Sequence, residues 1–211
     1  MTEPKNKTET LSETTKTYLI EVFIREVYKR KKDITNKYVQ KGLGVEEDAI
    51  TLLSLIDGVY YQKNETHYQN DFIIGTPDIV LTDSVKDIKS SWDIFTFFAS
   101  KFAAVNKMYY WQMQGYMWLT DTKYAQLHYC LIDTPETLIN DAKRRFLWNA
   151  GLLAENELSE KAFTEIDRNM TYSDIPRIER MHTIDIARND ADIERLQQRI
   201  IECREYITKT F

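Results

Sequence analysis

The sequence is poor in cysteine, glycine and proline, and each shortage excludes a class of protein. Its 211 residues include 2 Cys, 6 Gly and 4 Pro. The two thiols, Cys130 and Cys203, cannot form a disulfide framework or supply the four thiolates that an iron–sulfur cluster usually takes. With 43% hydrophobic and 29% charged residues and so little Gly and Pro, the chain is neither collagen-like nor of low complexity. We expect a folded domain.

The chain also lacks long apolar runs and an excess of positive charge. No stretch approaches the roughly 20 apolar residues that span a bilayer, and the polar start MTEPKNKTETLSETTK is unlike a signal peptide. We therefore expect a cytoplasmic protein without a membrane partner. The formal net charge is −5, so any contact with nucleic acid must come from a local basic patch or from metal ions held by carboxylates.

Hydrophobic spacing predicts a polar tail over residues 1–14 and a single domain over 15–211. Helices are expected from Thr15 to the Lys29–Lys32 run, over 45–57 after a break at Gly42 and Gly44, from Lys107, over 135–149, over 157–167, and from Asp190. Strands are expected within 58–71, in a hairpin over 72–92, over 123–133 and over 178–186, with an aromatic linker over 92–106. This order predicts an α/β or α+β fold around a mixed sheet.

The hairpin carries the chemistry. Strand residues alternate between faces, so Asp87 and Lys89 share one face. A two-residue turn at Asp83-Ser84 would bring Asp78 opposite Lys89, whereas a three-residue turn would not. Two aspartates beside an ammonium group are costly to bury unless each charge is matched. Together with a free carbonyl and Glu46, which helical spacing turns inward more than Glu47, they are the hard oxygen ligands that Mg²⁺ or Mn²⁺ prefers.

Taken alone, Asp87-x-Lys89 is also compatible with solvent-facing residues of an edge strand, and Asp78 with a Pro-Asp turn. The wider pattern is more specific. It comprises Gly42-x-x-x-Glu46-x-x-Ala49, Gly75-Thr76-Pro77-Asp78, Asp87-Ile88-Lys89 and Gln112-x-x-x-Tyr116. This set resembles the PD-(D/E)XK nuclease superfamily, and within it the lambda-exonuclease or YqaJ-type phage recombination exonucleases, over about 41–136.

The resemblance implies a restriction-endonuclease-like mixed β-sheet flanked by helices and a Mg²⁺-dependent (or Mn²⁺-dependent) deoxyribonuclease. By that likeness Asp78, Asp87 and the Ile88 carbonyl hold one metal, and Glu46 with Asp78 helps to hold a second. Lys89 positions the attacking water, and Gln112 belongs to the glutamine motif. The implied partners are DNA, a single-strand annealing protein and further copies of the same chain, in the host cytoplasm if the protein is phage-encoded. The branch with an iron–sulfur cluster is excluded by the two cysteines.

Candidate DNA-binding residues surround this set. Ser90 and Ser91 follow the lysine and are able to bond a phosphate, although strand-end hydroxyls also serve as caps. Gln112 and Tyr116 share a helical face and are also compatible with the edge of the core. The segment Trp92–Phe98 is either core or a wedge at a duplex end. We expect Arg25 and Arg30 to bind a terminal phosphate.

The sequence does not separate an exonuclease that resects double-strand ends from a structure- or sequence-specific endonuclease. A non-catalytic DNA-binding or assembly protein on the same fold is a further alternative, because a fold does not dictate a function.

Overall fold

The structure is a computed structural model that describes residues 4, 9–33, 35–152 and 156–211. The helices are α1 (Glu13–Tyr28), α2 (Lys37–Gly44), α3 (Glu46–Asp57), α4 (Ile94–Phe102), α5 (Lys107–Thr120), α6 (Glu136–Asn149), α7 (Glu157–Met170), a 3₁₀ turn (Arg177–Arg180) and α8 (Asp190–Thr210). The strands are β1 (Tyr68–Gln69), β2 (Ile74–Gly75), β3 (Ile79–Val80), β4 (Ser84–Ser90), β5 (Tyr124–Cys130) and β6 (Met181–Ala187).

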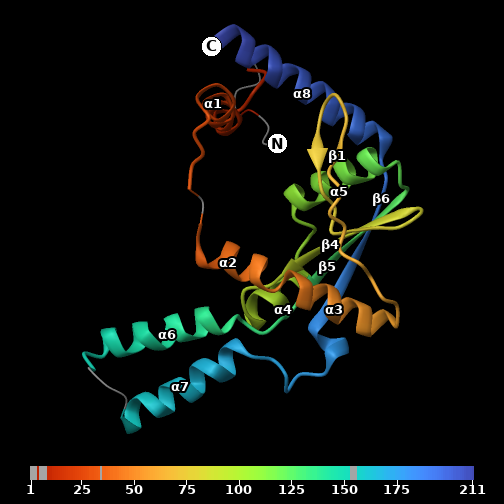
Figure 1. Ribbon diagram of the computed structural model, residues 1–211. Coiled ribbons are helices and arrows are strands. Elements are labelled where there is room, and N and C mark those ends of the chain that lie inside the picture. Colours follow the sequence, from red (N-terminus) through yellow and green to blue (C-terminus); the bar gives the residue numbers. More distant parts are fainter. Residues whose placement is uncertain (1–3, 5–8, 34, 153–155) are drawn as a thin grey trace.

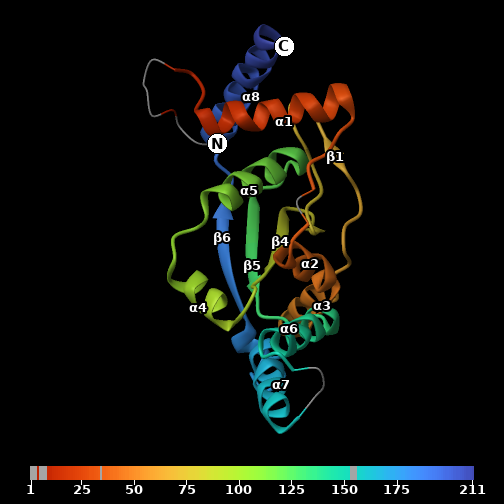
Figure 2. The same ribbon diagram turned by 90° about the vertical axis from the view of Figure 1, so that its left-hand side faces the viewer.

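A mixed sheet forms the centre, in the order β3-β4-β5-β6 (Figures 1 and 2). The β3–β4 and β5–β6 pairs are antiparallel and the β4–β5 pair is parallel. The strands β1 and β2 form a separate antiparallel pair. The predicted fold class, a mixed sheet flanked by helices, is confirmed.

Helices cover both faces of the sheet because each face buries its own apolar side chains. On one face Met113 and Met117 of α5 pack on Val85, Ala125 and Leu127. On the other face, residues of α3 and of the turn before it pack on β5 and the segment that follows it; this cluster comprises Val45, Ala49, Leu52, Cys130 and Ile132. The Cys130 thiol is free and fully buried, and burial raises its pKa to about 12.

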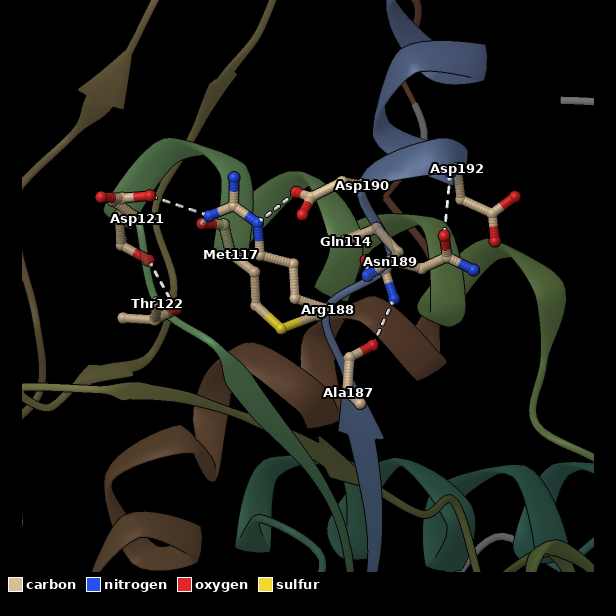
Figure 3. Close-up of polar contacts among 10 residues, drawn as sticks. Gln114, Met117, Asp121, Thr122, Ala187, Arg188, Asn189, Asp190 and Asp192 are labelled. Carbon is tan, nitrogen blue, oxygen red and sulfur yellow. Dashed lines mark hydrogen bonds and ion pairs between the residues drawn. The ribbon is translucent and has the colours of Figure 1, made fainter.

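A buried glutamine joins α5 to the end of the sheet (Figure 3). The Gln114 side chain is 0% exposed; its Nε2 donates to the Ala187 carbonyl and its Oε1 accepts from the Asn189 N–H. The adjacent Arg188 donates to the Met117 carbonyl and pairs with Asp121. These contacts fix the orientation of α5, which carries Gln112 and Tyr116 toward the sheet.

Three helical regions differ from the sequence prediction. The expected break before the 45–57 helix is present at Val45, but Gly42 and Gly44 belong to an unexpected helix before it, α2, whose cap Asn36 accepts hydrogen bonds from two backbone N–H groups. The stretch predicted as a linker contains the helix α4. The first helix begins at Glu13 rather than Thr15, and Leu11 before it is 4% exposed, so this part of the expected tail is packed. Residues 1–3 and 5–8 of that tail lie outside the described residues.

The outer helices lie at opposite ends of the molecule. In both views α1 lies beside α8 at one end, and α6 and α7 project together at the other (Figures 1 and 2). Within the described part of the chain, no helix combines the length and the apolar character needed to cross a bilayer.

Candidate active site

The strand β4 places Asp87 and Lys89 on the face that α5 covers. Asp87 is 2% exposed, and its Oδ2 lies 2.6 Å from the Lys89 Nζ. The ammonium group also lies 4.8 Å from the centre of the Tyr109 ring of α5. Asp87 Oδ2 nevertheless has no hydrogen bond of acceptable geometry, so a buried anionic oxygen is incompletely satisfied.

Asp78 reaches this pair from the residue before β3. The register pairs Ile79 with Lys86, so its continuation sets Asp78 opposite Asp87. The expected placement opposite Lys89 is therefore wrong by two residues, because the turn centres on Thr82-Asp83 rather than Asp83-Ser84. A shift of two residues keeps a side chain on the same face, and Asp78 still meets Asp87. Its Oδ2 accepts the Ile88 N–H at 2.6 Å.

Proline at position 77 frees the Ile88 carbonyl. Hydrogen-bonded pairs recur every second residue in an antiparallel ladder, and the Leu81 N–H donates to the Ser84 carbonyl at 2.8 Å. Continued along the same register, this pattern sets Pro77 opposite Ile88. Proline has no N–H to donate, so the ladder bond that the Ile88 carbonyl would otherwise accept is missing. The Pro-Asp motif thereby leaves a backbone oxygen beside two carboxylates.

The negative charges of the two aspartates repel each other. Burial, and then the charge of Asp87, raise the pKa of Asp78 to about 7, against the Ile88 hydrogen bond and the charge of Lys89. Burial also raises the pKa of Asp87. Anionic oxygens crowded in a low-dielectric site are costly, and a cation between them offsets that cost.

Glu46 lies at the N-terminus of α3, where the helix dipole favours an acid. Its charge raises the pKa of both Asp78 and Asp87, which places its carboxylate within electrostatic reach of them. The Glu46 Oε2 accepts from the Lys63 Nζ at 2.9 Å. Glu47 instead lines a groove with Tyr60 and Tyr61 along the flank of α3.

The donor set matches a hard divalent cation in chemistry. Carboxylates and a carbonyl are the oxygen ligands of Mg²⁺ and Mn²⁺, and the buried Asp87 Oδ2 of this set lacks a hydrogen bond of acceptable geometry. Yet no three His, Cys, Asp or Glu side chains of the described residues surround one point in metal-binding geometry. Lysines hold two of the carboxylates, since Lys89 contacts Asp87 and Lys63 contacts Glu46. Each lysine contacts one oxygen of its carboxylate, Asp87 Oδ2 and Glu46 Oε2 respectively.

The helix α5 brings Tyr116, and with it Gln112, to the side of the two aspartates. The Gln112 Nε2 donates to the Tyr116 hydroxyl at 2.8 Å. Burial, followed by the charge of Asp87, raises the pKa of Tyr116 to about 12. Gly75 makes room for this ring, because a Cβ there would lie 2.7 Å from Tyr116 Cε1. The glycine of the Gly-Thr-Pro-Asp motif was the sequence signal for this close approach.

The predicted DNA-binding residues divide into two groups. Ser90 ends β4, and the backbone N–H of the 9% exposed Ser91 donates to the Cys130 carbonyl. Both serines lie at the carboxyl end of the strand that carries Asp87, a member of the acidic cluster of Glu46, Asp78 and Asp87. Trp92 comes next and contacts the Tyr38 ring. Arg25 and Arg30 are not brought to this region: Arg25 lies on α1, at the α8 end of the molecule, and pairs with Glu26, while Arg30 follows that helix (Figure 2).

Two lysines beside this region were not predicted from the sequence. Lys63 pairs with Glu46, and Lys41 is 1% exposed and donates to the Trp92 carbonyl at 2.7 Å. Burial lowers the pKa of Lys41 to about 8. For Lys41, its place directly before the Gly42-x-x-x-Glu46 motif was the only available signal.

Comparison with solved structures confirms the resemblance that the motifs indicated. A phage-related exonuclease from Haemophilus somnus 129PT is similar over 99% of this chain and 89% of its own, with a TM-score of 0.78 and 29% sequence identity. The alkaline exonuclease LHK-Exo from Laribacter hongkongensis is similar over 95% of this chain and 83% of its own, with a TM-score of 0.65 and 14% identity. Its complex with dAMP gives a TM-score of 0.64, 15% identity and the same coverage.

The sequence comparisons are negative: no protein-family model matches the chain, and a search of curated proteins finds no match. The likeness to LHK-Exo, at 14% identity, concerns the fold alone.

Proposed function

Because this chain has the fold of phage exonucleases, we propose that it is a Mg²⁺-dependent or Mn²⁺-dependent deoxyribonuclease that resects double-strand DNA ends for recombination. The observation that carries the proposal is the cluster at β3 and β4. There Asp78 accepts the Ile88 N–H, Asp87 contacts Lys89, and both carboxylates lie within electrostatic reach of Glu46. The full-length likeness to the Haemophilus somnus exonuclease supports it.

Each residue has a role that follows from its chemistry. Asp78, Asp87, the Ile88 carbonyl and Glu46 would hold the metal. A bound divalent ion stabilises charge on the phosphate oxygens and lowers the pKa of coordinated water. Lys89, which is 24% exposed and contacts Asp87, would orient or deprotonate the attacking water. The hydrogen bond from Gln112 would hold the Tyr116 side chain in its orientation beside the aspartates.

The proposal extends to partners and setting. DNA is the substrate, and a single-strand annealing protein would take up the strand that resection exposes. Further copies of the chain would assemble through apolar side chains on α1, where Tyr18 is 58%, Val27 55% and Tyr28 61% exposed. The setting would be the cytoplasm, and the host cytoplasm for a phage-encoded protein.

The test is incubation of the purified protein with end-labelled linear duplex and with closed circular DNA, in Mg²⁺, Mn²⁺ or EDTA. We expect the linear duplex to lose its end label only with metal, and the closed circles to stay intact under all three conditions. Lys89→Met should lower the rate by about 10²- to 10⁴-fold, as for removal of a general base. Nicking of closed circles would instead support the endonuclease alternative, and binding without cleavage the non-catalytic one.

A further inference from the structure

A pocket of about 640 Å³ opens at the carboxyl end of β4, between α4, α6 and α7 and the start of α2. Its wall includes three aromatic rings, those of Trp92, Phe95 and Phe146. Lys37 and Arg145 also line it, together with the amide of Asn169. Elements distant in sequence thus bring rings, cations and an amide to one concave surface.

The cations of this pocket have no acidic partner among the residues that the structure describes. The Lys37 Nζ lies 4.8 Å from the centre of the Trp92 ring, and the Arg145 Nε donates to a backbone carbonyl, that of Asp141. The acid in the pocket wall, Asp93, caps α4 and accepts from the Thr96 N–H at 2.8 Å. Two cations without an ion-pair partner in the described part of the chain and one carboxylate therefore line the pocket, so its wall is net positive and an anionic ligand complements it.

One residue of the pocket wall, Trp92, is close in sequence to the acidic cluster. Trp92 comes three residues after Lys89, which is about 10 Å of extended backbone. That length corresponds to about three stacked nucleotides of one DNA strand. The Trp92 backbone is held firmly, because its carbonyl accepts from the buried Lys41. A strand with one phosphate at the acidic cluster would reach the pocket a few nucleotides away.

We propose that this pocket binds one unpaired nucleotide of single-stranded DNA. The base stacks on the Trp92 and Phe95 rings, and Lys37 and Arg145 contact its phosphates. Stacking on an aromatic face with cations on the backbone is the usual chemistry of single-strand sites. A paired base does not expose its face, so the pocket distinguishes an opened strand from continuous duplex. The inference rests on the proposed nuclease function and deepens it.

The chain offers a matched control for the experiment. Arg144 and Arg145 are neighbours on α6 and are both exposed, but Arg144 pairs with Asp141 and lines a different pocket. We would measure binding of a labelled single-stranded oligonucleotide to the full chain in EDTA, by fluorescence anisotropy at several salt concentrations, and repeat it with a blunt duplex.

We expect Arg145→Ala and Lys37→Ala each to weaken single-strand binding and to reduce the slope of log K against log salt by about 0.7, while Arg144→Ala leaves both unchanged. Phe95→Ala, a change at a 78% exposed ring, should weaken single-strand binding roughly tenfold and duplex binding little. Equal losses for Arg144→Ala and Arg145→Ala, equal losses on duplex and single strand, or no loss at all would overturn the proposal. Cleavage is not part of this readout, so a protein that binds through the pocket but does not cut DNA would contradict only the proposed nuclease function.

Discussion

At the scale of single residues, Asp78 illustrates how one side chain serves two purposes. It accepts the Ile88 N–H, and it brings a second carboxylate to Asp87. The second purpose opposes the stability of the fold, since burial and the neighbouring charge raise its pKa to about 7. Residues that are poorly placed for stability are common where a site is built for chemistry.

We predict that Asp78→Asn lowers cleavage by at least about 100-fold but leaves the melting temperature in EDTA equal or higher. Asparagine retains an oxygen for the Ile88 N–H and removes the negative charge that disfavours Asp87. A folded-state pKa above the unfolded value means that the ionised carboxylate destabilises the fold at neutral pH. The measurements are cleavage rates with Mg²⁺ and thermal unfolding in EDTA.

Asp48→Asn, at an exposed acid in the first turn of α3, is the control and should leave cleavage unchanged. If Asp78→Asn cut DNA at the rate of the unchanged protein, Asp78 would not be a metal ligand.

Glycine at position 75 has a specific steric purpose, and Gly75→Ala tests it. The new Cβ would lie 2.7 Å from Tyr116 Cε1 and 3.2 Å from Leu119 Cδ1. We expect a loss of about 1–3 kcal/mol in the free energy of unfolding, as for overpacking, together with slower cleavage because Tyr116 moves from Gln112. Gly42→Ala is the matched control: no atom lies within 4 Å of its Cβ, and alanine is the better helix former there. Urea unfolding of the two variants should therefore give shifts of opposite sign.

Among the elements, α4 forms where the sequence pattern predicts an aromatic linker. Its capping signal, Asp93 with Thr96 at the third helical position, lacks the glutamate of the usual capping box, and its rings point in several directions. Phe97 is fully buried with Leu131 and Tyr172, whereas Phe95 is 78% exposed. Phe97 therefore belongs to the core, and only the exposed rings of this segment are available for the predicted wedge at a duplex end.

We predict that Phe97→Ala costs about 3–5 kcal/mol of unfolding free energy because it leaves a cavity between α4 and β5. Phe95→Ala should change stability by less than about 0.5 kcal/mol, as for most exposed positions. Denaturant unfolding of both variants checks this difference. Similar losses for the two would mean that α4 packs on the sheet through another face.

At the scale of the whole molecule, the pH dependence of stability reflects a histidine buried in the sheet. His128 is 2% exposed, and its Nδ1 lies 2.9 Å from the Thr183 hydroxyl. Burial, and then the charge of Lys86, lower its pKa to about 4. The unfolded chain takes up this proton below about pH 6.5, but the folded chain takes it up only near pH 4. The fold therefore loses stability as the pH falls between these values.

We predict that this histidine costs the fold about 2 kcal/mol at pH 5 relative to pH 7. His128→Asn keeps a polar group near Thr183 and removes the titration. The difference in unfolding free energy between the variant and the unchanged protein should therefore shift by that amount in favour of the variant. Urea unfolding at both pH values measures it, and comparison within the pair cancels the other titrating groups. A constant difference would show that His128 is protonated in the fold.

Local sequence patterns predict which side chains share a face at the candidate site and most of the elements around it. Strand alternation set Asp87 and Lys89 on one face, and helical spacing turned Glu46 rather than Glu47 toward the aspartates. These inferences held because they depend on local periodicity, which a sequence states directly.

Tertiary structure alone decided the rest. The burial of Phe97 and the contacts of Lys63 with Glu46 and of Lys41 with Trp92 depend on segments that are separated in the chain. The hairpin register and the helix through Gly42 are likewise not recorded in the hydrophobic periodicity. Packing against such neighbours outweighs local propensity by several kcal/mol, and no periodic pattern records which neighbours will meet. For the same reason the sequence singled out Trp92 but not the pocket that α4, α6 and α7 form beside it.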